Sequence, residues 1–182
     1  MEFSATKIPG VLVIDPIVYE DGRGFLMETW RADKFAAEGI SAPFVQDVHS
    51  RSSIGTVRGL HYQVEQPQGK LIRVIQGEIF DVVVDLRKSS ATFGQWVSEK
   101  LSAGNRRLVW VPPGFAHGFM VLSEIADIEY RMTDYYAPEH GRTIRWDDPD
   151  IGIDWPHIGG EAPTMSEKDL AGVLLKDAET YA

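Results

Sequence analysis

Short strand-like segments follow one another at nearly even spacing through the middle of the chain, and this pattern restricts the possible folds more than any other feature. The segments cover residues 69–87, interrupted by QGE at 76–78, and then residues 96–101, 108–111, 117–122 and 128–132. The typical turn sequences SAGN and PPG lie between some of them. Many short strands separated by turns indicate an antiparallel sandwich or barrel, and the interior of such a barrel can hold one small ligand.

Two other segments are expected to contain short helices beside this β-structure. Residues 25–40 begin with a strand-like pattern and end as a short helix, which Gly39 closes. Residues 166–177 have a helical pattern, with Ser166 as the N-cap and Asp169 at the capping-box position. We therefore expect an all-β fold with a few short helices, including one near the C-terminus.

The composition is that of an ordinary globular chain, and it excludes several classes of function. A length of 182 residues predicts one domain that covers residues 1–182. A net charge of −9 argues against binding to nucleic acid or to an anionic membrane surface. The absence of cysteine excludes disulfides and thiolate metal sites. The apolar stretch in residues 1–15 is too short and too polar for a signal peptide or a spanning helix, so we expect a soluble, cytoplasmic protein.

Several charged or ionisable residues lie in segments that are otherwise apolar: Arg58, His61, Lys70, Arg73, His117 and Tyr130. Buried Lys and Arg are rare unless they are paired, so the positively charged residues of this set suggest a nearby anion, either an internal carboxylate or a bound phosphate. Each residue also has an ordinary structural explanation. A single strand histidine is more often structural than catalytic, an Arg or Lys is usually solvated, and a buried Tyr usually bonds its hydroxyl to a neighbour.

A metal site is a second way to use the histidines. The segment PPGFAH at 112–117 has the P-x-G-x-x-H pattern of a metal-binding strand pair in cupin barrels. The earlier strands offer only His61, followed by Tyr62 and Gln63, in place of an H-x-H pair. Two histidines without a thiolate form a thin set of ligands, although carboxylates could complete it. We therefore expect no metal, and we keep a metal-dependent cupin as an alternative.

Eight blocks of the sequence, in order, carry a resemblance to a known family. They are DGRGFLMETW (21–30), VRGLHYQ (57–63), QGKLIRV (68–74), DVVVDLRKSSATFGQW (81–96), WVPPGFAHGF (110–119), YRMTDYYAP (130–138), DDPDIGIDWP (147–156) and SEKD (166–169). With these blocks the chain resembles the dTDP-4-dehydrorhamnose 3,5-epimerases, which are nucleotide-sugar enzymes. The resemblance implies a cupin-like jelly-roll barrel with antiparallel strands.

The resemblance also implies the catalytic residues. His61 of RGLH corresponds to the general base, and Asp169 of SEKD corresponds to the carboxylate that holds it. Tyr130 corresponds to the acid on the opposite face of the sugar, and Lys70 of QGK corresponds to the group that stabilises an enolate. These residue types suit the chemistry, because a histidine can take a proton at neutral pH whereas a tyrosine is protonated and can donate one.

The substrate contacts that the resemblance implies are spread along the chain. Arg23 and Glu28 correspond to nucleotide contacts, delivered to the site of a neighbouring subunit. The further substrate-binding residues are Gln46, Arg58, His117, Tyr136 and Lys168. Family members are usually homodimers, need no cofactor, and epimerise a dTDP-4-keto-6-deoxyhexose at C3 and C5 on the way to dTDP-L-rhamnose.

The chain departs from the family pattern at two places. Val48 follows Gln46-Asp47, where the family usually has QDN, and the family usually has an acidic residue near Gly141. Both places concern substrate contacts, so a mono-epimerase that inverts only C3 or C5 of a related sugar is an alternative. A sugar-nucleotide binding protein without catalysis is a further one.

Overall fold

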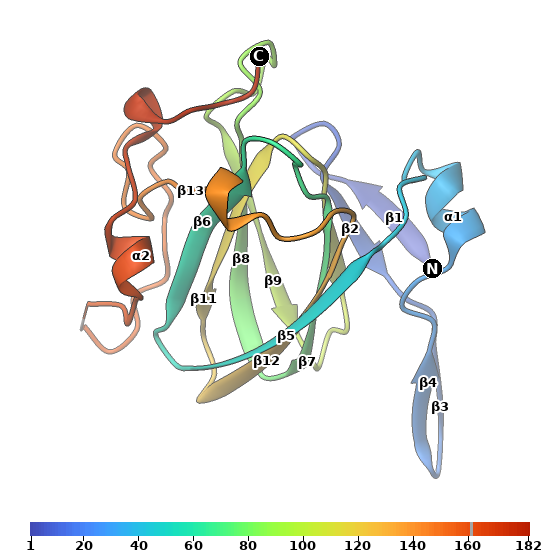
Figure 1. The fold of residues 1–182 in the computed structure, drawn as a ribbon. Helices are drawn as coiled ribbons and strands as arrows, with labels where there is room; N and C mark the ends of the chain where they lie inside the picture. The colour runs from blue at the N-terminus through green and yellow to red at the C-terminus, as the bar shows by residue number, and fades with distance from the viewer. Residues whose placement is uncertain (161) are drawn as a thin grey trace.

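Two antiparallel sheets face each other in the computed structural model, which describes residues 1–160 and 162–182 (Figure 1). The six-stranded sheet has the order β1 (Glu2–Ala5), β2 (Leu12–Asp15), β10 (Leu108–Val111), β7 (Lys70–Gln76), β12 (Ile125–Met132) and β5 (Gln46–Ser53). The five-stranded sheet has the order β13 (Gly141–Thr143), β6 (Val57–Gln63), β11 (Phe115–Val121), β8 (Glu78–Asp85) and β9 (Trp96–Ser102). The predicted all-β, antiparallel architecture is confirmed.

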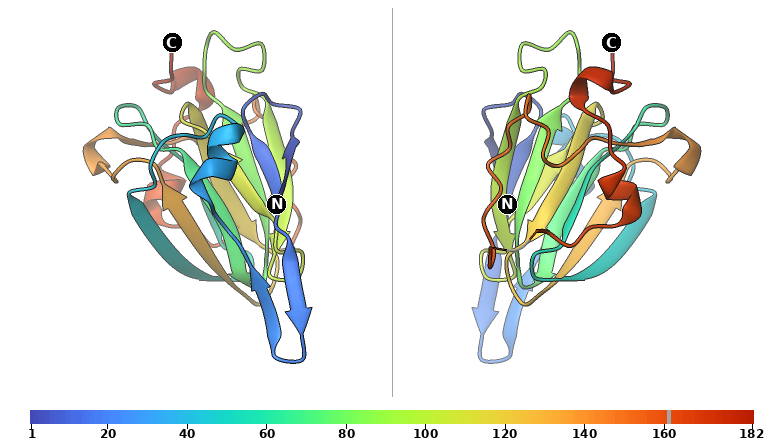
Figure 2. Two further views of the ribbon diagram at one scale, coloured as in Figure 1. Left: turned by 90° about the vertical axis from the view of Figure 1, so that its right-hand side faces the viewer. Right: turned by 90° about the vertical axis from the view of Figure 1, so that its left-hand side faces the viewer.

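A hairpin of β3 (Val18–Asp21) and β4 (Gly24–Met27) projects from the barrel, as both views in Figure 2 show. We call this hairpin, residues 18–27, the arm. Its flanks lead to the barrel at β2 and to the short helix α1 (Ala32–Ala37), so the predicted change from strand to helix within residues 25–40 is confirmed. Gly39 follows this helix with a φ of 82°, in the left-handed region that favours glycine.

The predicted helix at residues 166–177 is wrong in its extent. Helix α2 spans only Glu167–Leu170, with Ser166 as the expected N-cap, and the 3₁₀ helix η2 follows at Leu175–Asp177; another 3₁₀ helix, η1, spans Pro138–His140. Between α2 and η2, the backbone N–H of Val173 donates to the carbonyl of Thr143, and the N–H of Arg145 donates to the carbonyl of Val173. Pairing with the extended segment after β13 therefore replaces the helical hydrogen bonds. Among the described residues, no helix is long and apolar enough to cross a bilayer.

Three apolar clusters explain why several strands are apolar on both faces. The main cluster fills the space between the sheets, with Ile72 and Ile128 from one sheet and Val83 and Phe119 from the other. The outer face of the five-stranded sheet is covered by C-terminal residues such as Trp155, and that of the six-stranded sheet is covered by Phe35 of α1 and its neighbours. Burial of both faces makes strands such as β8 continuously apolar instead of alternating.

An irregularity in the pairing of β6 with its neighbour β11 breaks the alternation of side chains along β6. His61 is opposite His117, but Arg58 is opposite Phe119, so the register shifts between these pairs. Because of this shift, Arg58 and His61 both line the same pocket although they are three positions apart. Gly59 has a φ of 127°, and a Cβ atom on it would lie 2.5 Å from Cα of Gly118. The neighbour that requires a glycine at position 59 is therefore the adjacent strand β11.

Replacement of Gly59 tests the close approach of β6 to β11. We expect Gly59→Ala to lower the free energy of unfolding by roughly 2–4 kcal/mol, because overlap with β11 adds to the unfavourable backbone angle. Gly24→Ala is a matched control, since Gly24 has a φ of 126° but open space around its missing Cβ. Denaturant unfolding should show a clearly larger loss for Gly59→Ala, and equal losses would contradict the packing argument.

Candidate active site

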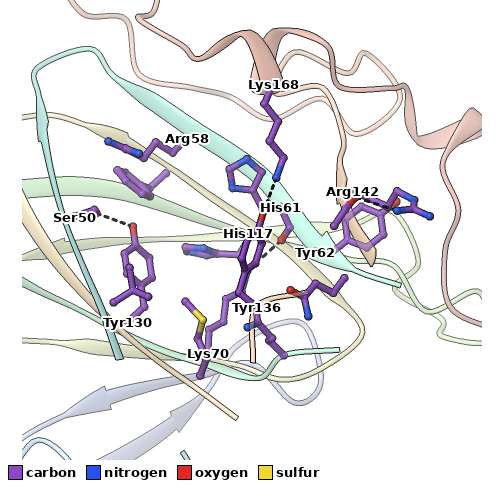
Figure 3. Close-up of a pocket in the computed structure, with 16 residues that line it drawn as sticks. Ser50, Arg58, His61, Tyr62, Lys70, His117, Tyr130, Tyr136, Arg142 and Lys168 are labelled. Atoms are coloured by element: carbon purple, nitrogen blue, oxygen red, sulfur yellow. Dashed lines mark hydrogen bonds between the residues drawn. The ribbon is translucent and has the colours of Figure 1, made fainter. Parts of the chain in front are cut away.

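A cavity of about 230 Å³ lies between the two sheets and is the place where most of the predicted site residues meet (Figure 3). It is lined by Val48, Ser50, Arg58, His61, Tyr62, Gln63, Gln68, Lys70, His117, Phe119, Tyr130, Met132, Tyr136, Gly141, Arg142 and Lys168. Four lining residues are Lys or Arg, and none of those named is Asp or Glu. In a chain of net charge −9, such a local excess of positive charge favours an anionic ligand.

His61 and Asp169 form a hydrogen-bonded pair between β6 and α2. The Nε2 atom of His61 contacts Oδ1 of Asp169, and the hydroxyl of Ser166 donates to Oδ2 of the same carboxylate at 2.7 Å. Burial lowers the pKa of His61, and the bonds to Asp169 oppose this shift in part. Burial acts to raise the pKa of Asp169, but its bonds to His61 and Ser166 outweigh this and keep the pKa below its usual value. At neutral pH the histidine is therefore mainly unprotonated beside an ionised carboxylate, which is the state that a general base requires.

Lys70 projects from β7 toward the same space. Its side chain follows the inward side of the strand, with Ile72 and Val74, and its Nζ donates to the main-chain carbonyl of His61 at 3.2 Å. Burial lowers the pKa of Lys70 to about 8, although the negative charge of Asp81 opposes this shift. Most of the lysine remains protonated at pH 7, so it can stabilise negative charge that develops on a ligand atom.

Tyr130 comes from β12 in the other sheet, so its hydroxyl and the His61 ring belong to opposite walls of the cavity (Figure 3). The hydroxyl lies 3.4 Å from the Oγ atom of Ser50 on β5. Burial raises the pKa of Tyr130 well above the ordinary value for a phenol. A protonated donor on one wall and an unprotonated base on the other can act on two faces of one bound molecule.

His117 forms a second histidine–carboxylate pair deeper in the barrel. Its Nε2 atom lies 2.7 Å from Oδ2 of Asp81, and both side chains are buried. The His117 ring centroid is 6.2 Å from that of Tyr130. Sequence reasoning missed Asp81, although an acidic residue between the apolar residues of FDVVV was a visible signal.

The remaining predicted contacts lie around the cavity. The Nε atom of Arg58 donates to the Ser52 hydroxyl at 2.9 Å, and the rest of its guanidinium makes no hydrogen bond or ion pair with the described residues. The Nζ atom of Lys168 lies 3.5 Å from the hydroxyl of Tyr136, and both side chains line the cavity. Gln46 does not line the cavity, but its side-chain oxygen accepts a bond from the backbone N–H of Tyr136 at 2.9 Å.

Sequence reasoning also missed lining residues that come from β13 and from the end of β6. Arg142 adds a cation and is held by Glu179 of the C-terminal segment at 3.0 Å. The side-chain amide of Gln63 accepts a bond from the N–H of Ala137 and donates to the carbonyl of Tyr135. No local pattern distinguishes Arg142 from a solvated arginine, because its position depends on the pairing of β13 with β6.

The structure does not bring Arg23 and Glu28 to this cavity. Arg23 is at the tip of the arm, with 91% of its side chain exposed, and bonds to Asp21 in the same hairpin. Glu28 pairs with Lys34 of α1 at 2.7 Å. Within one chain these two residues are therefore separate from the other predicted contacts.

The structure also tests whether the histidines belong to a metal site. Among the residues that the structure describes, no three His, Asp or Glu side chains are close enough together to hold a metal ion. His61 and His117 line one cavity, but their Nε2 atoms bond to two different carboxylates, those of Asp169 and Asp81. The donor set therefore gives no support to the metal-dependent alternative.

Comparisons with known proteins agree with the resemblance seen in the sequence. The model of the dTDP-4-dehydrorhamnose 3,5-epimerase family matches residues 5–177. A dTDP-4-dehydrorhamnose 3,5-epimerase from Pseudomonas aeruginosa is 52% identical over 182 residues, which cover 100% of this chain and 99% of that protein.

Two solved structures show the same similarity in three dimensions. One is a dTDP-6-deoxy-D-glucose-3,5-epimerase from Legionella pneumophila in complex with dTDP-4-keto-L-rhamnose, with 49% identity, a TM-score of 0.94 and coverage of 98% of this chain and 94% of that one. The other is a 3'-monoepimerase from Streptomyces bikiniensis in complex with dTDP-quinovose, with 31% identity, a TM-score of 0.86 and coverage of 94% and 86%.

Proposed function

Because this chain belongs to the dTDP-4-dehydrorhamnose 3,5-epimerase family, we propose that it inverts C3 and C5 of dTDP-4-keto-6-deoxyglucose in dTDP-L-rhamnose biosynthesis. The observation that carries the proposal is the cavity in which an unprotonated histidine and a protonated tyrosine lie on opposite walls. The higher identity to 3,5-epimerases than to the 3'-monoepimerase favours inversion of both centres.

The reaction begins with removal of a proton beside the ketone. His61 takes the proton from C3 or C5, and the C–H electron pair forms a C=C bond while the ketone π electrons move to oxygen. The resulting enolate oxygen receives a hydrogen bond from the ammonium group of Lys70. Asp169 stabilises the imidazolium that forms and keeps the ring in place, as its hydrogen bond with His61 allows.

Inversion requires that the proton return from the other face of the sugar ring. Tyr130 donates its O–H proton to the carbanion carbon as the enolate collapses to the ketone. Before the second carbon reacts, the imidazolium of His61 releases its proton to solvent and the phenolate of Tyr130 takes one up, so both groups return to their starting states. The raised pKa of Tyr130 keeps the hydroxyl protonated in the resting site. Repetition at the second carbon gives the doubly inverted product.

The positive charge around the cavity suits the diphosphate of the substrate. Arg58 and Lys168 offer donors at its rim, and arginine is well matched to phosphate oxygens. Together with His117 and Tyr136, they are the proposed substrate-binding residues of this chain. Gln46 supports this group by holding the backbone of Tyr136.

The arm supplies the argument for a homodimer. Tyr19 and Leu26 on the arm are 64% and 72% exposed, and an isolated two-stranded hairpin is only marginally stable in water. We propose that the arm packs on a second copy and delivers Arg23 to the nucleotide in that copy's site, with Glu28 at its base. One domain, a cytoplasmic location and independence from a cofactor stay predictions from the sequence.

Deuterium labelling tests the proposed reaction directly. Incubation with dTDP-4-keto-6-deoxyglucose in D2O should give product that carries deuterium at two carbons, C3 and C5, detected by mass spectrometry and NMR. The rate should not change when a chelator is present. Deuterium at one carbon would identify a mono-epimerase, loss of activity with the chelator would support a metalloenzyme, and binding without deuterium uptake would indicate a non-catalytic protein.

The pair of His61 and Asp169 predicts a pH effect. Removal of the carboxylate charge in Asp169→Asn should lower the pKa of His61 further, because that charge favours the imidazolium. The acid limb of the kcat/KM profile should therefore move to lower pH, while kcat falls by roughly 10- to 100-fold because the base is weaker and less well oriented. Asp177→Asn, an exposed change in the same segment, is the control. An acid limb that moves to higher pH would contradict the assignment.

A further inference from the structure

Arg106 links the barrel to the arm by contacts with both of its strands. The Nη1 atom of Arg106 lies 2.6 Å from Oε1 of Glu20 on β3, and the guanidinium carbon lies 4.3 Å from the ring centroid of Phe25 on β4. Glu20 and Phe25 are directly opposite each other in the hairpin. One side chain therefore engages a cross-strand pair, so it restrains the direction of the whole hairpin and not of one strand alone.

The backbone at Arg106 has an unusual conformation for an arginine. Its φ is 59°, in the left-handed region where glycine or asparagine is usual. The arginine occupies this position even though the preceding residue, Asn105, is of a type that adopts it more readily. Asn105 makes the local bonds of this turn, since its side chain accepts from the N–H groups of Ser102 and Arg107. The turn itself does not need the Arg106 side chain, which is 75% covered and directed to the arm.

The other ion pairs near the arm do not connect it to the barrel. Arg107, the next residue, bonds to Asp15 of β2 and Glu99 of β9, which both belong to the barrel. Arg23 pairs with Asp21 inside the arm. Among the described residues, Arg106 is the one outside the arm whose side chain makes an ion pair with either arm strand.

We propose that Arg106 is a positioning residue, which sets the direction of the arm and thereby places Arg23 in the nucleotide site of a second copy. This inference rests on the proposed function, in which the arm serves the neighbouring site. Arg106 itself does not touch the substrate. Its loss should therefore weaken substrate binding without changing the chemical step.

Arg106→Gly is the sharpest variant, because glycine accepts the left-handed backbone and only the link to the arm is removed. We expect the KM for the dTDP sugar to rise by roughly threefold to tenfold with kcat within about twofold of the wild type. Arg106→Lys keeps a charge for Glu20 and should recover part of the KM. Arg107→Ala removes the neighbouring arginine of the same turn and should leave KM unchanged.

A double-mutant cycle separates positioning of Arg23 from a general structural role. If Arg106 acts through Arg23, Arg106→Gly should raise KM far less in an Arg23→Ala background than in the wild type. Equal effects in both backgrounds, a wild-type KM for Arg106→Gly, or a fall in kcat without a change in KM would each overturn the proposal.

Trypsin cleavage at Arg23 gives a second measurement, which does not depend on activity. The arm of Arg106→Gly should be cut faster at this tip than that of Arg107→Ala, at equal melting temperatures, because an arm that leaves its docked position exposes Arg23 to the protease. Equal cleavage would overturn the role of Arg106 even if the wild type proves to be an epimerase. Absence of epimerisation by the wild type would instead reject the proposed function, and faster cleavage would still show the link to the arm.

Discussion

His61→Ala is expected to lower kcat for epimerisation by at least about 10³-fold while the protein stays folded, because no other base among the described lining residues is free to take its place. His117 is the other histidine there, but its Nε2 atom is engaged with the buried carboxylate of Asp81. The loss should extend to deuterium exchange, since removal of the carbon-bound proton is the first step in both processes. Steady-state kinetics and exchange in D2O measure the two effects separately.

The control for His61→Ala is a histidine that does not line the cavity. His157 is exposed and does not line the pocket, so His157→Ala should retain wild-type kinetics. Circular dichroism and a melting curve of His61→Ala would confirm that the barrel is intact. Activity within tenfold of the wild type would show that His61 is not the base.

Tyr130→Phe should have a different effect, which separates the two halves of the reaction. Net epimerisation should fall by roughly 10²-fold or more, because the proton donor of the opposite wall is lost. Exchange of substrate hydrogen with D2O should continue, because His61 can remove a proton and return a deuteron to the same face. The expected product is therefore labelled substrate with unchanged stereochemistry, which NMR distinguishes from the epimer.

Removal of the Tyr130 hydroxyl also leaves the Ser50 hydroxyl without this contact, so the fold needs a check. Tyr135→Phe is a suitable control, since Tyr135 is 63% exposed and does not line the cavity. A Tyr130→Phe variant that loses exchange and epimerisation together would assign Tyr130 to binding or to proton removal. Full retention of epimerisation would remove it from the mechanism.

The fold could be predicted because its strands carry their own signals. Turns such as QGE and PPG divide the segments, and the alternation along β7 places Lys70 on the same face as Ile72 and Val74. The helix after Ser166 was overestimated, since its residues pair with the chain beyond β13 instead of continuing the helix. Local propensity could not show this competition, because the partner lies far away in the sequence.

The site could be predicted in part. Most of the predicted residues, including His61, Lys70 and Tyr130, line one cavity, and Asp169 contacts His61 from α2. The strand pattern alone would have directed Arg58 away from His61, because the register shift opposite β11 is a tertiary feature. Arg23 and Glu28 lie outside the cavity of their own chain, so their roles depend on a second copy.

The distance along the chain between His61 and Asp169 has a consequence for how the protein is made. Every strand of both sheets is synthesised before residue 169, yet the proposed base has no carboxylate partner until that residue has left the ribosome and α2 has docked beside β6. Full catalytic competence therefore has to wait until the segment around Asp169 has been made, after all the strands. A nascent chain can contain every barrel strand and still turn over the sugar nucleotide poorly, so full activity reports that the segment around Asp169 has been made and has docked beside β6.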